Sequence, residues 1–206
     1  TDDIVIRQDK ADKKINALTG EKLSNLLSEL KTINYTAYVI VNIAAYAGLR
    51  IGEILALKRF DVKNKKITVE RQHVLKDKRK YAQRSPKSKN SYRIVPMPKE
   101  LVDVLDEYKK REPENIDGFL FHGINNTNVN NAIKKVEKGI TIHSLRHTYA
   151  TTLLANGVDI KTVAALLGDT VETVINTYVH YNDDMRETLQ YFMDAYIDYC
   201  YDNLNY

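Results

Sequence analysis

The chain has one cysteine, Cys200, among its 206 residues. A single thiol excludes an internal disulfide, which fits a reducing cytoplasm. No apolar run approaches the roughly 20 residues that a membrane-spanning helix needs, and no basic-then-apolar signal peptide stands at the start. We therefore expect a cytoplasmic protein without a membrane partner.

Several motifs of metal and nucleotide chemistry are also missing from the sequence. It has no pair of cysteines, no His-Glu-x-x-His and no tight set of carboxylates suited to a two-metal nuclease. The Gly-x-x-x-x-Gly-Lys-Thr loop that binds nucleotide phosphates is absent too. These absences favour a chemistry that uses neither a metal nor another cofactor.

Charge is unevenly spread along the chain, whose net charge is +4. Residues 76–93 hold eight basic residues and one acidic residue, whereas residues 183–203 hold six acidic residues and one basic residue. A basic body with an acidic tail favours binding to nucleic acid, although a solvated lysine-rich loop has the same composition. The side chains expected to contact the nucleic acid are Lys76, Lys78, Arg79, Lys80, Arg84, Lys89 and Arg93.

The hydrophobic pattern predicts an α+β fold that is predominantly helical, with a small sheet. Strands at residues 67–71 and 92–95 should flank the basic stretch. Thr19 and Asp159 are expected N-caps, and Gly48 is an expected helix stop. The predicted helices cover residues 19–30, 34–46, 51–57, 98–111, 143–154, 159–167 and 187–201, and residues 125–131 begin either a helix or a loop.

Four residues could together attack a phosphodiester: Arg50, His143, Arg146 and Tyr178. A free tyrosine, with a pKa of about 10, is a poor nucleophile at neutral pH. Cationic groups beside it favour the phenolate and hold a phosphate. Arginine remains charged and offers planar, paired donors to phosphate oxygens. Two arginines could therefore hold both non-bridging oxygens as charge builds in the transition state.

Neighbouring residues refine this set. His143 and Arg146 are three residues apart and should share one helix face, where His143 could donate to phosphate or exchange a proton with Tyr178. His147 is expected to point about 100° away from His143 and to be structural. Glu53 could orient Arg50 or cap the helix that follows it, and we expect the structural role.

Three stretches closely resemble the active-site boxes of the tyrosine recombinases, the phage and transposon integrase family. They are residues 47–53 (AGLRIGE), 143–148 (HSLRHT) and 176–180 (NTYVH). The resemblance implies a catalytic domain at residues 19–186 with a small antiparallel sheet, a linker at 1–18 from a separate DNA-binding domain, and a tail helix at 187–206. It also implies a site-specific recombinase that cleaves and rejoins DNA through a 3′-phosphotyrosyl link at Tyr178.

The same resemblance implies partners and a general acid. Four protomers would synapse two duplexes, and the tail helix would dock on a neighbouring protomer, although docking on its own domain is equally compatible with its apolar stripe. Residues 86–96 (PKSKNSYRIVP) resemble the β-hairpin that carries the family's catalytic lysine. Lys87 is the expected acid for the departing 5′-oxygen, with Lys89 as the alternative.

Asp169 departs from the family, whose members usually have histidine or tryptophan after Leu-Gly at this place. An ionised carboxylate cannot donate a hydrogen bond to phosphate. Three interpretations follow: Asp169 orients an arginine or accepts the Tyr178 proton, it caps the helix from Val171, or the site is weakened. We expect a combined capping and orienting role.

Two other classes of protein fit part of the chain. Residues 153–167 are similar to a helix-turn-helix, so a regulator that binds DNA without cleaving it would not need Tyr178. A type IB topoisomerase would use the same phosphotyrosine chemistry without a partner site. A covalent adduct separates enzyme from binding module, and strand exchange separates recombinase from topoisomerase.

Overall fold

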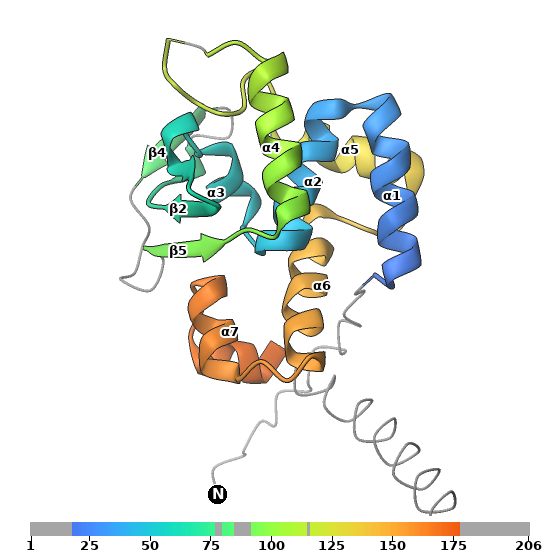
Figure 1. Ribbon diagram of the computed structural model, residues 1–206, viewed down its shortest axis with the longest axis vertical. Helices are drawn as coiled ribbons and strands as arrows, with labels where there is room; N and C mark the ends of the chain where they lie inside the picture. The colour runs from blue at the N-terminus through green and yellow to red at the C-terminus, as the bar shows by residue number, and fades with distance from the viewer. Residues whose placement is uncertain (1–17, 77–79, 85–91, 115, 178–206) are drawn as a thin grey trace, which may run out of the picture.

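The computed structural model describes residues 18–76, 80–84, 92–114 and 116–177. This part of the chain is mostly helical, as predicted (Figure 1). Residues 171–177 are helical as well. The named helices are α1 (Gly20–Ile33), α2 (Tyr35–Ala47), α3 (Ile51–Leu55), the 3-10 helix η1 (Arg59–Asp61), α4 (Lys99–Arg111), α5 (Asn126–Val136), α6 (Ile142–Ala155) and α7 (Ile160–Leu167).

Polar caps set the boundaries of the first two helices. The Thr19 hydroxyl accepts the Lys22 N–H at the start of α1, and the Asn34 side chain accepts the Ala37 N–H at the start of α2. Gly48 ends α2 in the left-handed region, with φ of 65°. A residue without Cβ takes this conformation at the lowest cost. These boundaries agree with the predicted caps within a residue or two.

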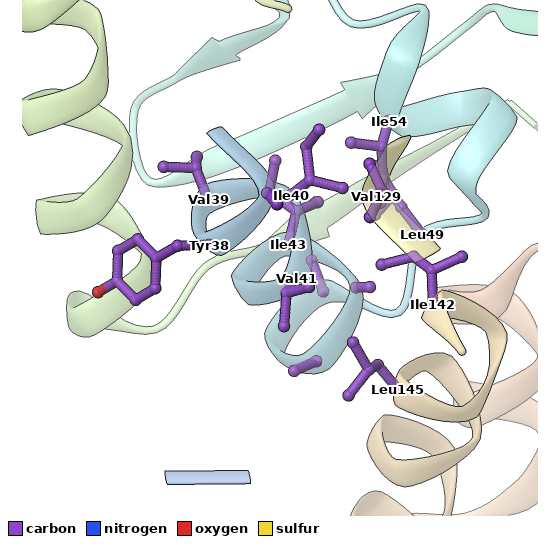
Figure 2. Close-up of a cluster of buried hydrophobic side chains, with 14 of the residues drawn as sticks. Tyr38, Val39, Ile40, Val41, Ile43, Leu49, Ile54, Val129, Ile142 and Leu145 are labelled. Atoms are coloured by element: carbon purple, nitrogen blue, oxygen red, sulfur yellow. The ribbon is translucent and has the colours of Figure 1, made fainter. Parts of the chain in front are cut away.

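Helix α2 forms the centre of the main hydrophobic core. Ten of its 13 residues are buried, so its apolar surface is covered on nearly every side. It packs against α1, α4, α5 and α6. Figure 2 shows Ile40 and Ile43 of α2 among Leu49, Ile54 and other apolar side chains from neighbouring elements. Burial on this scale explains why an apolar, weakly amphipathic segment forms a stable helix.

The strands form two small antiparallel sheets. The first has the order β1-β2-β5 and consists of Val62–Lys63, Lys66–Val69 and Arg93–Pro96. The second pairs β3 (Gln72–Lys76) with β4 (Lys80–Arg84). The two predicted strands correspond to β2 and β5. The segment between them, which we predicted only as a basic stretch, contains the β3–β4 hairpin.

A second, smaller core holds the C-terminal part of the described chain. Its buried side chains are Ala150, Val163, Ala164, Leu167 and Val174. Helix α7 packs against α6 and against β5, and lies below the strand in Figure 1. This packing brings the turn after α7 to the first sheet and to the start of α3. No helix among the described residues is long and apolar enough to cross a membrane.

Candidate active site

Arg50 lies at a reversal of the chain between two helices. It follows the left-handed Gly48 and the buried Leu49, and is the N-cap residue of α3. Its side chain is 36% exposed, so the guanidinium is partly open to solvent. The buried Gly48 and Leu49 before it, and the buried Glu53 after it, fix where this charge is placed.

Arg146 is the buried counterpart of Arg50. Its side chain is only 4% exposed and points from α6 toward the turns after α2 and α7. Nη1 donates to the Gly48 carbonyl at 2.5 Å, and Nη2 donates to the Leu167 carbonyl at 2.8 Å. A buried cation is stable only when such partners replace water. Arg146 therefore joins three segments that are far apart in the sequence.

Asp169 bridges the two arginines. One carboxylate oxygen accepts from Arg50 Nη2, and the other accepts from Arg146 Nη2 at 2.6 Å. The expected orienting role agrees with this geometry. The expected capping role is wrong, because the Thr170 hydroxyl accepts the Thr173 N–H at 3.1 Å instead. Two charged donors bind a carboxylate more strongly than backbone N–H groups do.

The two guanidiniums and His143 line one cleft of about 290 Å³. The other lining residues are Leu49, Ile51, Gly52, Gln72, His73 and Ile142. Helix α3 and strand β3 meet closely at this cleft, since a Cβ on Gly52 would lie 2.7 Å from the His73 carbonyl oxygen. Neither Asp169 nor Glu53 lines the cleft, so both carboxylates bind the Arg50 guanidinium without lining the cleft themselves.

His143 and His147 stack edge to face on α6, with ring centroids 4.4 Å apart. The prediction that they point in different directions is wrong, because four residues advance a helix by about 400°, which leaves them about 40° apart. Burial, His143 and Arg146 lower the pKa of His147 to about 4. Desolvation, Arg146 and Arg50 also lower the pKa of His143, although Asp169 opposes them and the residue remains exposed. His143 is therefore neutral at neutral pH.

Glu53 both caps α3 and orients Arg50. It accepts the Arg50 backbone N–H at 2.8 Å and Arg50 Nη1 at 3.2 Å. Burial raises its pKa, but hydrogen bonding and charge from Arg93 outweigh burial, so the pKa lies below its ordinary value. Glu53 is thus a buried anion held by two arginines.

Arg93 does not occupy the position expected of a DNA-contacting residue. Its side chain is 6% exposed, and its guanidinium donates to both Glu53 oxygens at 3.0 and 2.8 Å. Its Nε donates to the Leu166 carbonyl at 2.7 Å. The interior ion pair removes this charge from the surface that DNA could reach. Nothing in the sequence distinguished Arg93 from the lysines before it, because its partner lies 40 residues away.

Several predicted site residues lie outside the described residues. These are Tyr178, Lys78, Arg79, Lys87 and Lys89, together with residues 1–17 of the predicted linker and the predicted tail helix. Lys76, Lys80 and Arg84 belong to β3 and β4, and only the backbone of these three residues is described. Among the residues that the structure describes, no group of histidines, cysteines and carboxylates could hold a metal ion.

Comparison with known sequences supports the resemblance. The sequence profile described as "Phage integrase family" matches residues 16–185. A "Tyrosine recombinase XerC-like" protein of Caldanaerobacter subterraneus is 30% identical, over 84% of this chain and 52% of that protein. "Tyrosine recombinase XerA" of Thermococcus kodakarensis is 31% identical, over 74% of this chain and 53% of its own length. The chain thus spans about half the length of these curated relatives.

Solved structures agree with the fold. The crystal structure of XerA recombinase superposes with a TM-score of 0.68 at 27% identity, covering 90% of this chain and 66% of that one. The Tn1549 transposon integrase, solved in complex with transposon right-end DNA, gives a TM-score of 0.72 at 23% identity, over 89% of this chain and 68% of that one. At that identity the second comparison shows the fold alone. The predicted fold class is confirmed.

Proposed function

This chain belongs to the phage integrase family, and on that premise we propose that it carries the catalytic domain, residues 19–186, of a site-specific DNA recombinase. The enzyme would integrate or excise a mobile element by cleaving and rejoining double-stranded DNA. The observation that carries the proposal is the convergence of Arg50, Arg146 and His143 on one cleft from segments nearly 100 residues apart.

The arginines would bind the phosphate at the cleavage site. The cleft is lined by both guanidiniums, while their other N–H groups are held by Glu53, Asp169 and main-chain carbonyls. Each guanidinium could then donate to one non-bridging oxygen of the phosphate. Such preorganised donors stabilise the charge that builds on phosphorus in the transition state, and removing one typically costs about 2.7–4 kcal/mol.

Tyr178 would be the nucleophile. Its phenolic oxygen attacks phosphorus, forming a 3′-phosphotyrosyl bond while the bond from phosphorus to the 5′-oxygen breaks. The neutral imidazole of His143 can accept the phenolic proton, because its lowered pKa keeps a lone pair free at neutral pH. Lys87, or alternatively Lys89, would give a proton to the 5′-oxygen. Attack of a 5′-hydroxyl on the phosphotyrosine reverses these steps and needs no cofactor.

The basic hairpin and the tail would supply the remaining contacts. Lys76, Lys80 and Arg84 on β3 and β4, with Lys78, Arg79 and Lys89 nearby in sequence, are proposed to bind DNA phosphates. A homo-tetramer on synapsed DNA, linked by the tail helix, is the proposed assembly. Phosphate contacts of this kind make binding weaken as salt rises.

A covalent adduct tests the proposal directly. A nicked duplex from the element's own junction would be incubated with wild type, Tyr178→Phe and the control Tyr46→Phe, in buffer without divalent metal. Wild type and Tyr46→Phe should give a shifted band on a denaturing gel, and Tyr178→Phe should not. DNA binding without any adduct would favour a non-catalytic binding protein, and an adduct without exchange between two duplexes would favour a topoisomerase.

A further inference from the structure

Five charged side chains of alternating sign form a continuous series of ion pairs at the cleft. In order they are Arg93, Glu53, Arg50, Asp169 and Arg146. Only Arg50 and Arg146 of the five line the cleft. The series therefore begins, at Arg93, with a cation that does not line the cleft of Arg50 and Arg146.

Arg93 makes more bonds than a simple charge partner needs. Its fork donates to both oxygens of Glu53, and its Nε reaches the Leu166 carbonyl in the last turn of α7. The next carbonyl, Leu167, accepts from Arg146 at 2.8 Å. Arg93 thus joins β5 to the start of α3 and to the end of α7, the segments that carry Arg50 and Asp169.

Glu53 transmits this constraint to Arg50. The oxygen that accepts the Arg50 backbone N–H also accepts Arg93 Nη2, and the oxygen that accepts Arg50 Nη1 also accepts Arg93 Nη1. Glu53 is 3% exposed at its side chain, so without Arg93 its buried charge would lose its main partner. The carboxylate would then turn more fully toward Arg50 or toward water.

We propose that Arg93 is a positioning residue that, through Glu53, holds the Arg50 guanidinium where it meets the scissile phosphate. This inference rests on the proposed function and assigns Arg93 a role other than phosphate binding. A misplacement of about 1 Å at a reacting centre can lower a rate by about 100-fold. The effect should fall on the cleavage step, since Arg93 itself does not line the cleft.

The test compares Arg93→Gln with the control Arg71→Gln. Arg71 pairs with Asp61, which is also 3% exposed and also caps a helix, by accepting the Lys58 N–H at 2.7 Å. Both variants therefore leave a buried capping carboxylate without its arginine, but only one of these carboxylates contacts Arg50. Single-turnover cleavage at saturating DNA, DNA affinity and thermal unfolding would be measured for both, with Tyr178→Phe as the inactive reference.

Arg93→Gln should cleave about 10- to 100-fold more slowly with DNA affinity nearly unchanged, whereas Arg71→Gln should cleave like wild type at a similar loss of stability. Equal cleavage by the two folded variants would overturn the inference, as would a loss that appears only in DNA affinity. Wild type without an adduct would overturn the proposed function and this inference together.

A double-mutant cycle separates action through Glu53 from a general structural effect. Glu53→Gln should slow cleavage on its own, and adding it to Arg93→Gln should cost less than the product of the two single effects, because both act on one contact. Independent, multiplicative losses would contradict the positioning role. If Arg93→Gln does not fold, Arg93→Lys retains the charge but loses the fork, and should give an intermediate rate.

Discussion

Replacing Asp169 by asparagine should destabilise the folded protein even though the two side chains have the same shape. The carboxylate accepts from Arg50 with one oxygen and from Arg146 with the other. Asparagine keeps one acceptor oxygen but presents an NH₂ group to the second guanidinium. Arg146 is 4% exposed and cannot turn to water to replace the lost partner.

The expected loss follows from the burial of the pair. Removing one partner of a fully buried ion pair costs about 3–5 kcal/mol. Asp169 is 21% exposed, and the Gly48 and Leu167 carbonyls still hold Arg146. One charge-assisted hydrogen bond, worth about 1.5–3 kcal/mol, is lost. The other is weakened, because its acceptor is now a neutral amide oxygen. We therefore expect Asp169→Asn to lower the free energy of unfolding by about 2–4 kcal/mol.

Urea unfolding at neutral pH would measure this difference. With a slope of about 2 kcal/mol per molar urea, in the middle of the usual range, the midpoint should fall by roughly 1–2 M. Asp103→Asn is the control, since it breaks an exposed ion pair with Lys99 that should contribute little to stability. Added sulfate should stabilise Asp169→Asn more than wild type, because an anion could then occupy the place of the carboxylate.

An unchanged midpoint in Asp169→Asn would refute the view that this carboxylate organises the arginines. Asp169→His gives a second check, because it introduces the residue more usual in the family. Histidine cannot accept from both guanidiniums as a carboxylate does. We therefore expect Asp169→His to be less stable than wild type, and an equally stable, more active variant would show that position 169 faces the phosphate.

Three further changes test other parts of the structure. Gly48→Ala should lower the free energy of unfolding by about 2 kcal/mol or more in urea titrations, since φ is 65° there and the new Cβ would lie 2.8 Å from Tyr149 Cε1. Arg50→Lys should keep DNA binding but lower single-turnover cleavage by about 100- to 1,000-fold, because it loses the planar fork. Below pH 6.5 the unfolded chain binds a proton at His147 that the folded chain, with a pKa of about 4, does not. Stability should therefore fall from about pH 6.5 toward pH 4, and a fall of the same size in His147→Gln would contradict this assignment.

Local features of the fold could be read from the sequence because they depend on neighbours. Thr19 and Asp159 cap their helices through N–H groups two or three residues away. Gly48 stops α2 because the chain needs a positive φ there, wherever the rest of the protein lies. The hydrophobic pattern likewise predicted helices in the segments that form α1 to α4, α6 and α7.

The sequence indicated only part of the arrangement of the site. The motifs around Arg50 and Arg146 indicated that both belong to one site, and we expected Asp169 to orient an arginine. Nothing in the sequence indicated that Asp169 would bridge both arginines or that Arg93 would bind Glu53. The β3–β4 hairpin was missed because its strands lie in or next to the basic stretch and lack a regular alternation of apolar and polar residues.

The tertiary structure alone decided which partner each charged side chain has. Arg93 and the lysines that we expected to bind DNA belong to one basic stretch of the sequence, but the packing of β5 on α7 buries Arg93 beside Glu53. The sequence left Asp169 between capping a helix and orienting an arginine, and the packing places it between two arginines, one of them 119 residues away. The sequence determined which residue types were available. Their roles were determined by folding, which buries opposite charges from distant segments together, because buried ions are stable only when they are paired.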